Sequence, residues 1–359
     1  MNPLRLLSKL LGRNTSQSQS NFPYGLDHAI LNTPIPPPSM WMNVGYWKNT
    51  DDFPTACAAL LDQVLITAGL IDEAGGAVNH PPGRRLRLLD VGIGCGDQSL
   101  RVLGYKRKCV VGREGEEKDE KHEESLFDSY VGITSLPVQA EYATKRVEDI
   151  IIWREKETGT EIEDEKHGPE KQAPRLRARI FCADAAKPSS WSTEIHPLLN
   201  PNLETKGKEE EDSTWLLALD TLYHFTPSRT PLFKYTNSTL TANIMAFDLL
   251  LPSTPLSLIQ RILLRLLCLI TRTPYSNFLT REQYTALLVA AGYDESKISF
   301  RDISGDVFSG IAGYIRKRQE MLRMYGMGGG MGKFKGAKVV FGWWARTGVV
   351  RGVIVVARV

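Results

Sequence analysis

Three glycines at alternate positions follow an apolar stretch in the segment LLDVGIGCGDQ, residues 88–98. Gly92, Gly94 and Gly96 have no Cβ, so the backbone there can approach a ligand closely. A helix that begins near Asp97 would direct its free N–H groups at the same ligand. The spacing G-x-G-x-G differs from the G-x-G-x-x-G of dinucleotide folds, and the Gly-Lys-Ser/Thr of a P-loop is absent. The segment therefore predicts a nucleotide-binding turn of a different class.

Three further segments each join an apolar strand to a polar turn: YVGITSLPVQAEYA (130–143), RIFCADAAKPSSW (179–191) and WLLALDTLYHF (215–225). Together with the glycine loop, they resemble the class I S-adenosylmethionine-dependent methyltransferases. The segment 130–143 is similar to the small-molecule and lipid subgroup that contains tocopherol, sterol and cyclopropane-fatty-acid-type enzymes. The resemblance implies a doubly wound, Rossmann-like α/β fold with a mainly parallel seven-stranded sheet, and S-adenosyl-L-methionine as the cofactor.

The resemblance also implies which residues hold the cofactor. Asp90, at the end of the first strand, would meet the methionyl ammonium or its bound water, and Asp184 would accept from the adenine amine. Thr134 and Gln139 would contact the ribose, where many methyltransferases carry an acid. The expected cofactor-binding residues are Asp90, Gly92, Gly94, Cys95, Gly96, Thr134, Gln139, Asp184, Ala185 and Asp220. Two alternatives stay open, in which Asp90 has only a structural role and Asp184 caps a helix.

The candidate catalytic residues are His224, Tyr223 and Tyr46. His224 follows the fourth strand at the carboxyl edge of the sheet, and an imidazole can take up a proton near neutral pH. The alternative is that His224 bonds to neighbouring backbone and only shapes the pocket. Tyr46 and Tyr223 would orient the acceptor or would only pack. Tyr46 belongs to MNVGYW (42–47), which resembles the N-terminal segment that closes over the cofactor in this subgroup.

Composition disfavours several other classes of function. The net charge is +3 in 359 residues, and we find no basic patch with interleaved aromatic residues, so nucleic-acid binding is not expected. Five cysteines at scattered spacings, without a C-x-x-C pair or a His cluster, predict a reduced intracellular protein without a bound metal. No run approaches the roughly 20 apolar residues of a membrane span. One catalytic domain is expected over residues 40–359.

Residues 1–39 are expected to form a flexible N-terminal arm, closed by the prolines at positions 34 and 36–38. Arg5, Lys9 and Arg13 stand among leucines, with no acid before Asp27, which fits a frayed tail or a targeting segment. A cytoplasmic location is expected, with a mitochondrial or a peripheral membrane location as alternatives. Charged segments near 112–124, 154–172 and 200–212 are poor in apolar residues and are expected to be solvated insertions.

Hydrophobic periodicity predicts a helix over 52–70 and a buried fifth strand over 243–252. Near the C-terminus, AKVVFGWWA (337–345) and VVRGVIVVAR (349–358) predict a β-hairpin around a turn at 346–348. The hairpin would place an antiparallel seventh strand in the sheet. In this respect the C-terminus resembles that of class I methyltransferases. The glycine-rich residues 326–332 are expected to form a flexible approach to it.

Residues 254–272 predict a helix with an unusually wide apolar face. Its narrow polar stripe consists of Ser257, Arg261, Arg265, Cys268 and Arg272. An apolar face that wide needs a partner, which is the core, an apolar substrate beneath a helical cap, or a membrane interface.

These observations predict a methyltransferase that acts on a small, fairly apolar or lipid-like acceptor, with residues 254–272 as a helical cap. One alternative is methylation or cyclopropanation of a lipid alkene at a membrane surface contacted by the same helix. Another is a cofactor-binding scaffold that has lost turnover. Whether carbon, nitrogen or oxygen is methylated stays open, as does the oligomeric state.

Overall fold

The structure is a computed structural model that describes residues 33–78, 85–111, 120–157, 177–199, 212–332 and 334–359. The strands in these ranges are β1 (Leu86–Val91), β2 (Lys106–Val111), β3 (Glu120–Ser125), β4 (Ser129–Thr134), β5 (Arg177–Cys182), β6 (Ser213–Leu219), β7 (Ala242–Leu250), β8 (Ile298–Asp302) and β9 (Arg351–Ala357). Among the described residues, seven of these strands form one sheet in the order β5-β4-β1-β6-β7-β9-β8. Neighbours are parallel except at β9, which is antiparallel to β7 and β8. The prediction of a mainly parallel seven-stranded sheet is confirmed.

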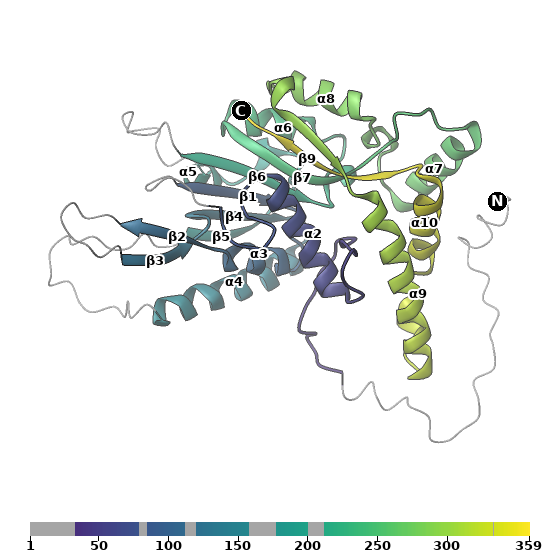
Figure 1. The fold of residues 1–359 in the computed structure, drawn as a ribbon, viewed down its shortest axis with the longest axis horizontal. Coiled ribbons are helices and arrows are strands. Elements are labelled where there is room, and N and C mark those ends of the chain that lie inside the picture. Colours follow the sequence, from purple (N-terminus) through teal and green to yellow (C-terminus); the bar gives the residue numbers. More distant parts are fainter. Residues whose placement is uncertain (1–32, 79–84, 112–119, 158–176, 200–211, 333) are drawn as a thin grey trace.

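Helices cover both faces of this sheet (Figure 1). They are α2 (Phe53–Thr67), α3 (Asp97–Gly104), α4 (Pro137–Glu157), α5 (Ile195–Leu199), α6 (Thr230–Ser238), α7 (Leu258–Thr271), α8 (Arg281–Ala290), α9 (Phe308–Met324) and α10 (Phe334–Thr347). Successive strand residues point to opposite faces, so Leu88 and Leu89 lie in two different cores. The core around Leu88 includes side chains of α2, α3, α4, α7, α9 and α10, and the core around Leu89 includes those of α5, α6 and α8.

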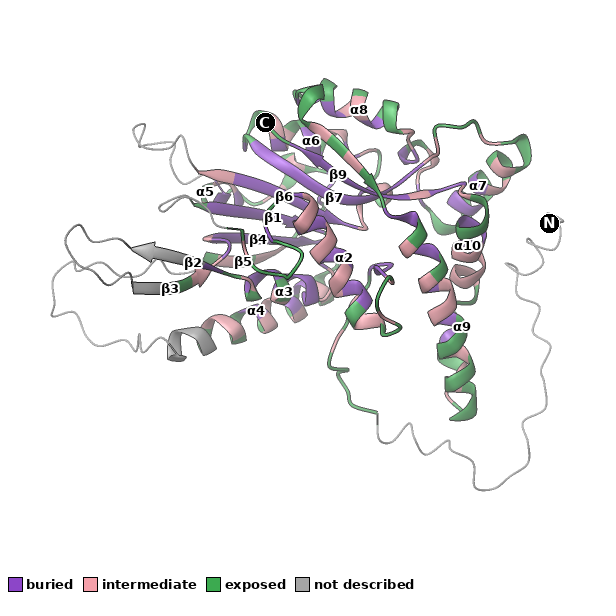
Figure 2. Ribbon diagram, in the orientation of Figure 1, coloured by how far each residue is buried: buried purple, intermediate pink, exposed green. Residues whose placement is uncertain are grey.

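Coverage on both faces explains why the central strands are continuous apolar runs. Every residue of β1, β4 and β7 is buried, as parallel strands between two helical layers require. Figure 2 shows this buried centre and the exposed end of α9, which extends beyond the sheet. The carboxyl ends of the parallel strands meet at one edge, where the connections to the following helices are free to form a site.

The prediction of a C-terminal hairpin is wrong for its first half. Residues 337–345 lie in helix α10, and Val340, Trp343 and Trp344 are buried at helical spacing. The Trp344 ring packs at 5.3 Å from the ring of Phe308 in α9. A short apolar run is compatible with a buried strand and with a buried helix. Here packing against α9 stabilises the helix. The antiparallel strand β9 is confirmed, but its partners β7 and β8 precede α9 and α10 in the chain.

The other expected elements lie close to their predicted bounds. The helix expected over 52–70 is α2, whose N-cap Asp52 accepts a 3.0 Å hydrogen bond from the Thr55 backbone N–H. The strand expected over 243–252 is β7, and the helix expected over 254–272 is α7. The glycine-rich approach includes a 3₁₀ turn, Gly328–Met331, between α9 and α10.

Parts of the predicted arm and insertions lie outside the described residues, namely 1–32, 112–119, 158–176 and 200–211. Residues 120–124 of the first insertion were expected to form a solvated loop, but they belong to β3, which pairs antiparallel with β2. Backbone pairing with β2 overrides the low apolar content of this segment. No helix in the described ranges is both long and apolar enough to cross a bilayer.

Gly348 ends α10 in the left-handed conformation, with φ +62°, and its N–H donates to the Trp344 carbonyl at 2.8 Å. Gly348→Ala is expected to lower the free energy of unfolding by about 1 kcal/mol, because a Cβ disfavours this conformation. Gly348→Asn is expected to lower the free energy of unfolding by less, since Asn adopts the left-handed conformation more readily than Ala. Urea denaturation measures both. Equal stability of the Ala variant and the parent would contradict this role of Gly348.

Candidate functional site

The glycine loop connects β1 to α3 at the carboxyl edge of the sheet. Gly92, Gly94 and Gly96 have φ angles of +79°, +56° and +88°. A Cβ on Gly92 would lie 2.5 Å from Thr221 Oγ1, and one on Gly96 would lie 3.0 Å from Ala143 Cβ. Gly94 has only Met42 Sδ near the position of a Cβ, at 3.8 Å. Gly92 and Gly96 therefore allow close packing within the protein, whereas Gly94 leaves open space beside a cavity.

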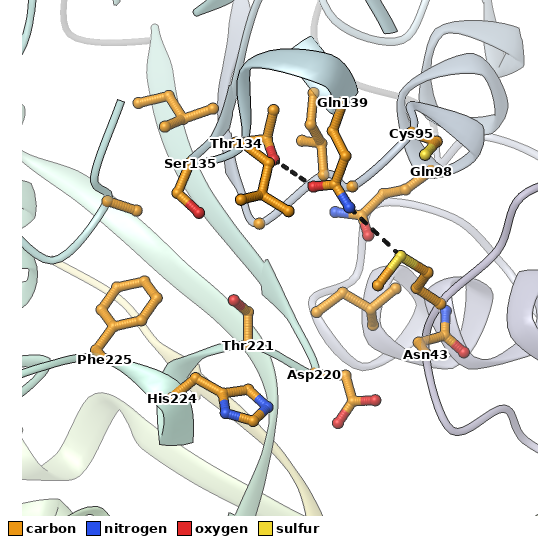
Figure 3. Close-up of a pocket in the computed structure, with 18 of the residues that line it drawn as sticks. Asn43, Cys95, Gln98, Thr134, Ser135, Gln139, Asp220, Thr221, His224 and Phe225 are labelled. Carbon is orange, nitrogen blue, oxygen red and sulfur yellow. Dashed lines mark hydrogen bonds between the residues drawn. The ribbon is translucent and has the colours of Figure 1, made fainter. Parts of the chain in front are cut away.

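This cavity has a volume of about 600 Å³, which is within the usual range for small-molecule sites. Its wall is formed by the glycine loop, the residues after β4, β5 and β6, and residues 40–43 of the N-terminal segment. Figure 3 shows Thr134 and Gln139 on one side and Asp220 and His224 on the other. The structure thus brings the four predicted motifs together at one site.

Asp90, which was expected to meet the methionyl ammonium or its bound water, is not in the wall of the cavity. Its fully buried carboxylate accepts a 2.8 Å hydrogen bond from the Tyr130 hydroxyl and another from the Gln98 side-chain amide. Burial raises the pKa of Asp90 to about 8. Gln98 does line the cavity. The short aspartate side chain points into the core behind the loop, so Asp90 acts on the cavity by positioning Gln98.

Sequence reasoning missed an ion pair between Asp97 and Arg146. The two Arg146 Nη atoms lie 2.8 and 3.1 Å from the Asp97 carboxylate oxygens, and Arg146 also donates to the Cys95 carbonyl at 2.9 Å. Asp97 and Cys95 line the cavity, while Arg146 is a residue of α4. An acid in the first turn of a helix is a recognisable signal for Asp97. Nothing in the local sequence points to Arg146, because the contact spans 49 residues.

Asp220 is the acid that faces the cavity without a cationic partner among the described residues. It has a left-handed backbone, with φ +58°. Its carboxylate accepts from the Tyr223 hydroxyl and from the Val44 backbone N–H, both at 2.9 Å. Burial raises the pKa of Asp220 to about 7. The contact with Val44 holds the N-terminal segment against the site, where Met42 and Asn43 form part of the wall.

Tyr46, a candidate for orienting the acceptor, does not line this cavity. Its side chain borders a smaller hollow with Asn49 and Asp62. Burial and the neighbouring carboxylate of Asp306 raise the pKa of the Tyr46 hydroxyl. The alternative from the sequence, in which Tyr46 only packs, agrees with its exposed fraction of 8%.

Thr134 and Gln139 both line the cavity and bond to each other. The Thr134 hydroxyl donates to Gln139 Oε1 at 2.9 Å, and the Gln139 amide contacts Met42 Sδ at 3.6 Å (Figure 3). This polar pair lies directly after β4, where the sequence predicted contacts to a ribose. Met42 from the N-terminal segment thus contacts the opposite wall.

Asp184 and Ala185 lie in the wall after β5, as expected. The Asp184 carboxylate accepts from the Ala186 N–H at 3.0 Å and pairs with Lys187 at 3.1 Å. These contacts close a turn, whereas the alternative left open by the sequence was a helix cap; the N-cap of the 3₁₀ helix that follows, Pro188–Ser190, is Lys187. Its side chain is 46% exposed, so it remains accessible from the cavity.

His224 and Tyr223 stand side by side in a 3₁₀ turn, Leu222–His224, after β6. Their ring centroids are 4.2 Å apart, and His224 Nδ1 lies 3.4 Å from the Thr273 hydroxyl. Burial of the ring lowers the pKa of His224, so the neutral form predominates near neutral pH. Residues 254–272, expected as a helical cap, do not line the cavity. Thr273, one residue beyond the C-cap of α7, lies beside His224 at its rim.

A buried ion pair holds the turn that carries His224. Arg229 and Asp248 are both fully buried and bonded to each other, and Arg229 also donates to the Asn277 carbonyl. The Asn277 amide donates to the Tyr223 and Phe225 carbonyls at 3.0 and 2.7 Å. The carbonyls on both sides of His224 are therefore anchored to the ion pair.

No family model and no curated protein matches the sequence. Among solved structures, the cyclopropane synthase MmaA2 from Mycobacterium tuberculosis aligns with a TM-score of 0.52 and 14% identity, over 88% of this chain and 90% of the other. The chain has the Rossmann-like methyltransferase fold. The mycolic acid cyclopropane synthase CmaA1, crystallised with SAH and CTAB, aligns with a TM-score of 0.51 and 12% identity, over 88% of this chain and 90% of the other. At 14% and 12% sequence identity, these similarities support a shared fold and no more than that.

Removing one partner of the buried ion pair should destabilise the protein strongly. Arg229→Met leaves the Asp248 carboxylate buried with only neutral donors, the Leu249 backbone N–H at 2.8 Å and the Tyr284 hydroxyl at 3.1 Å. We expect a loss of about 3–5 kcal/mol in the free energy of unfolding for this variant. The double variant Arg229→Met/Asp248→Leu should lose less, because it leaves no buried charge. Urea denaturation compares the two, and an equal or larger loss in the double variant would contradict the argument.

Proposed function

We propose that this protein is an S-adenosylmethionine-dependent methyltransferase that acts on a small, apolar or lipid-like acceptor. The observation that carries the proposal is the Asp220 carboxylate. It lines the same cavity as the glycine loop and has no cationic partner among the described residues. S-adenosylmethionine carries two positive groups, a sulfonium and an ammonium, and one carboxylate. A carboxylate that is largely removed from water and has only neutral hydrogen-bond donors is stabilised by a bound cation of this kind.

The other wall residues fit the remaining parts of the cofactor. Gly94 leaves space for a ligand beside the loop, and Gln98 presents its side-chain amide there. Thr134 and Gln139 supply hydroxyl and amide groups suited to the ribose, and Asp184 and Ala185 lie where an adenine would end. When bound, the cofactor supplies an activated methyl group, so the protein has mainly to align the acceptor.

The acceptor would bind on the side of His224 and the N-terminal segment. Met40, Trp41, Met42 and Phe225 give this part of the wall its apolar character. The neutral imidazole of His224 can accept a proton from a hydroxyl or amine acceptor. The Tyr223 hydroxyl already donates to Asp220, so Tyr223 acts by positioning that carboxylate.

A second candidate function is addition of a methylene group to a lipid alkene. It is favoured by the neutral His224 at the rim, because ring closure releases one proton to a base, and two proteins of the same fold are named cyclopropane synthases. Both reactions give the same increase in product mass. Nuclear magnetic resonance separates them, since only cyclopropanation removes the alkene protons and adds ring protons.

Calorimetry with S-adenosylmethionine tests the cofactor site. We expect the parent to bind and Gly94→Val to bind more than about tenfold more weakly, because its side chain would occupy the cavity. Gly69→Val is the matched control. Gly69 also has a positive φ, +73°, with nothing within 4 Å of its Cβ position, and it does not line the cavity. Failure of the folded parent to bind would contradict the proposal, as would equal losses in both variants.

The pKa of Asp220 predicts the pH dependence of binding. A cation prefers the carboxylate form, which is lost as the pH falls through the folded-state pKa of about 7. Affinity of the parent for S-adenosylmethionine should therefore fall about tenfold from about pH 8 to about pH 6. Asp220→Asn should bind more weakly at the higher pH and lack this dependence.

The titrations of Asp90 and His224 are common to the parent and Asp220→Asn, so they largely cancel in the ratio of the two affinities. A ratio that stays constant over this pH range would exclude Asp220 as the group that recognises the cofactor.

A further inference from the structure

Helix α7 exposes a row of large aliphatic side chains to solvent. The most exposed are Leu269 at 77% and Leu258 at 71%. The complete row is Leu258, Ile259, Ile262, Leu266, Leu269 and Ile270, which we call the aliphatic strip. Folded proteins rarely leave so many neighbouring aliphatic side chains uncovered unless the surface binds something.

The helical positions of these residues divide α7 into three faces. At about 100° per residue, the aliphatic strip covers an arc of about 120°. Arg261, Arg265 and Arg272 lie together in an arc of about 40° at one edge of the strip. Leu264, Leu267 and Cys268 form the buried face and pack in the same core as Val340 and Trp343 of α10. The strip and the arginines therefore project from the body of the protein side by side.

The charged residues that neighbour the strip in the sequence are mostly basic. Between Asp248 and Glu282 the sequence contains four arginines and no Asp or Glu. The helices α9 and α10 carry seven Lys or Arg residues and one acid, Glu320. Because the whole chain has a net charge of only +3, this basic character is concentrated in these parts of the sequence. Such a surface is complementary to an anionic partner and would repel a second copy of itself.

The end of α7 also touches the candidate site. Thr273, immediately after the C-cap Arg272, has its hydroxyl 3.4 Å from His224 Nδ1. A surface in contact with the aliphatic strip would therefore lie near the rim on which we place the acceptor.

We propose that α7 docks on an anionic lipid bilayer. The aliphatic strip enters the boundary between headgroups and acyl chains, and the arginines beside it contact the anionic headgroups. A wide apolar arc bordered by basic residues is the pattern that such interfacial helices share. Docking requires no bound cofactor, so it stands apart from the proposal of methyl transfer and is testable without turnover.

Sedimentation of the full chain with vesicles tests the proposal. One vesicle type contains phosphatidylcholine and phosphatidylserine, and the other contains phosphatidylcholine alone. We expect the parent to sediment with the anionic vesicles, and binding to weaken as salt is added. Leu269→Glu should reduce binding about tenfold or more, and Arg261→Gln about fivefold.

Two matched controls lie on α6 and α8, which cover the other face of the sheet. Val289→Glu places the same charge at an exposed aliphatic position of α8, and Lys234→Gln removes a basic residue of α6. Both should bind as the parent does. Circular dichroism verifies that each variant is folded, and the strongly exposed Leu269 is a site where substitution leaves the core intact.

Three results would overturn the proposal. In the first, the parent stays in the supernatant with both vesicle types. In the second, Leu269→Glu and Arg261→Gln bind as well as the controls, which would assign vesicle binding to another part of the chain. In the third, light scattering shows an oligomer that Leu269→Glu dissociates, which would assign the strip to a second copy. Retained cofactor binding in the α7 variants would separate a docking defect from a defect in the candidate site.

Discussion

The buried ion pair between Arg229 and Asp248 is the contact on which the acceptor side of the cavity depends. It joins the start of α6 to the end of β7 and, through Tyr284, to α8. Arg229 also holds Asn277, which binds the backbone on both sides of His224. A buried charge cannot move away from its partner without a large cost in free energy. The turn beside the cavity is therefore fixed by elements far from it in sequence.

Charge compensation within the cavity determines where a cationic ligand would bind. Asp97 is neutralised by Arg146, and Asp184 is paired with Lys187. Asp220 has only neutral donors among the described residues, and burial raises its pKa despite their hydrogen bonds. The same carboxylate holds the N-terminal segment through a backbone N–H. In the proposed function, ligand recognition and the position of that segment would therefore depend on one group.

The two elements nearest the rim differ in how much of their apolar surface is covered. The N-terminal segment reaches across the cavity, and Met42 there contacts Gln139 on the opposite wall. Helix α7 buries one face in the core, but its aliphatic strip stays exposed beside three arginines. The helix contributes no residue to the cavity wall in the described ranges. The wide apolar face of α7 was expected to belong to a cap. One part of it is buried in the core and the other part is exposed to solvent.

The sequence by itself determined the glycine loop, the strand that precedes it and the order of the four motifs, because these depend on local backbone preference and on runs of buried apolar residues. It also named Asp220 as a candidate, and Asp220 lines the cavity. It did not separate the roles of Asp90 and Asp220, and it assigned 337–345 to a strand. Whether a carboxylate faces a cavity or the core, and whether an apolar run packs as helix or strand, is decided by contacts between distant segments. Arg146 reaches the glycine loop only through such a contact, so only the tertiary structure could place it there.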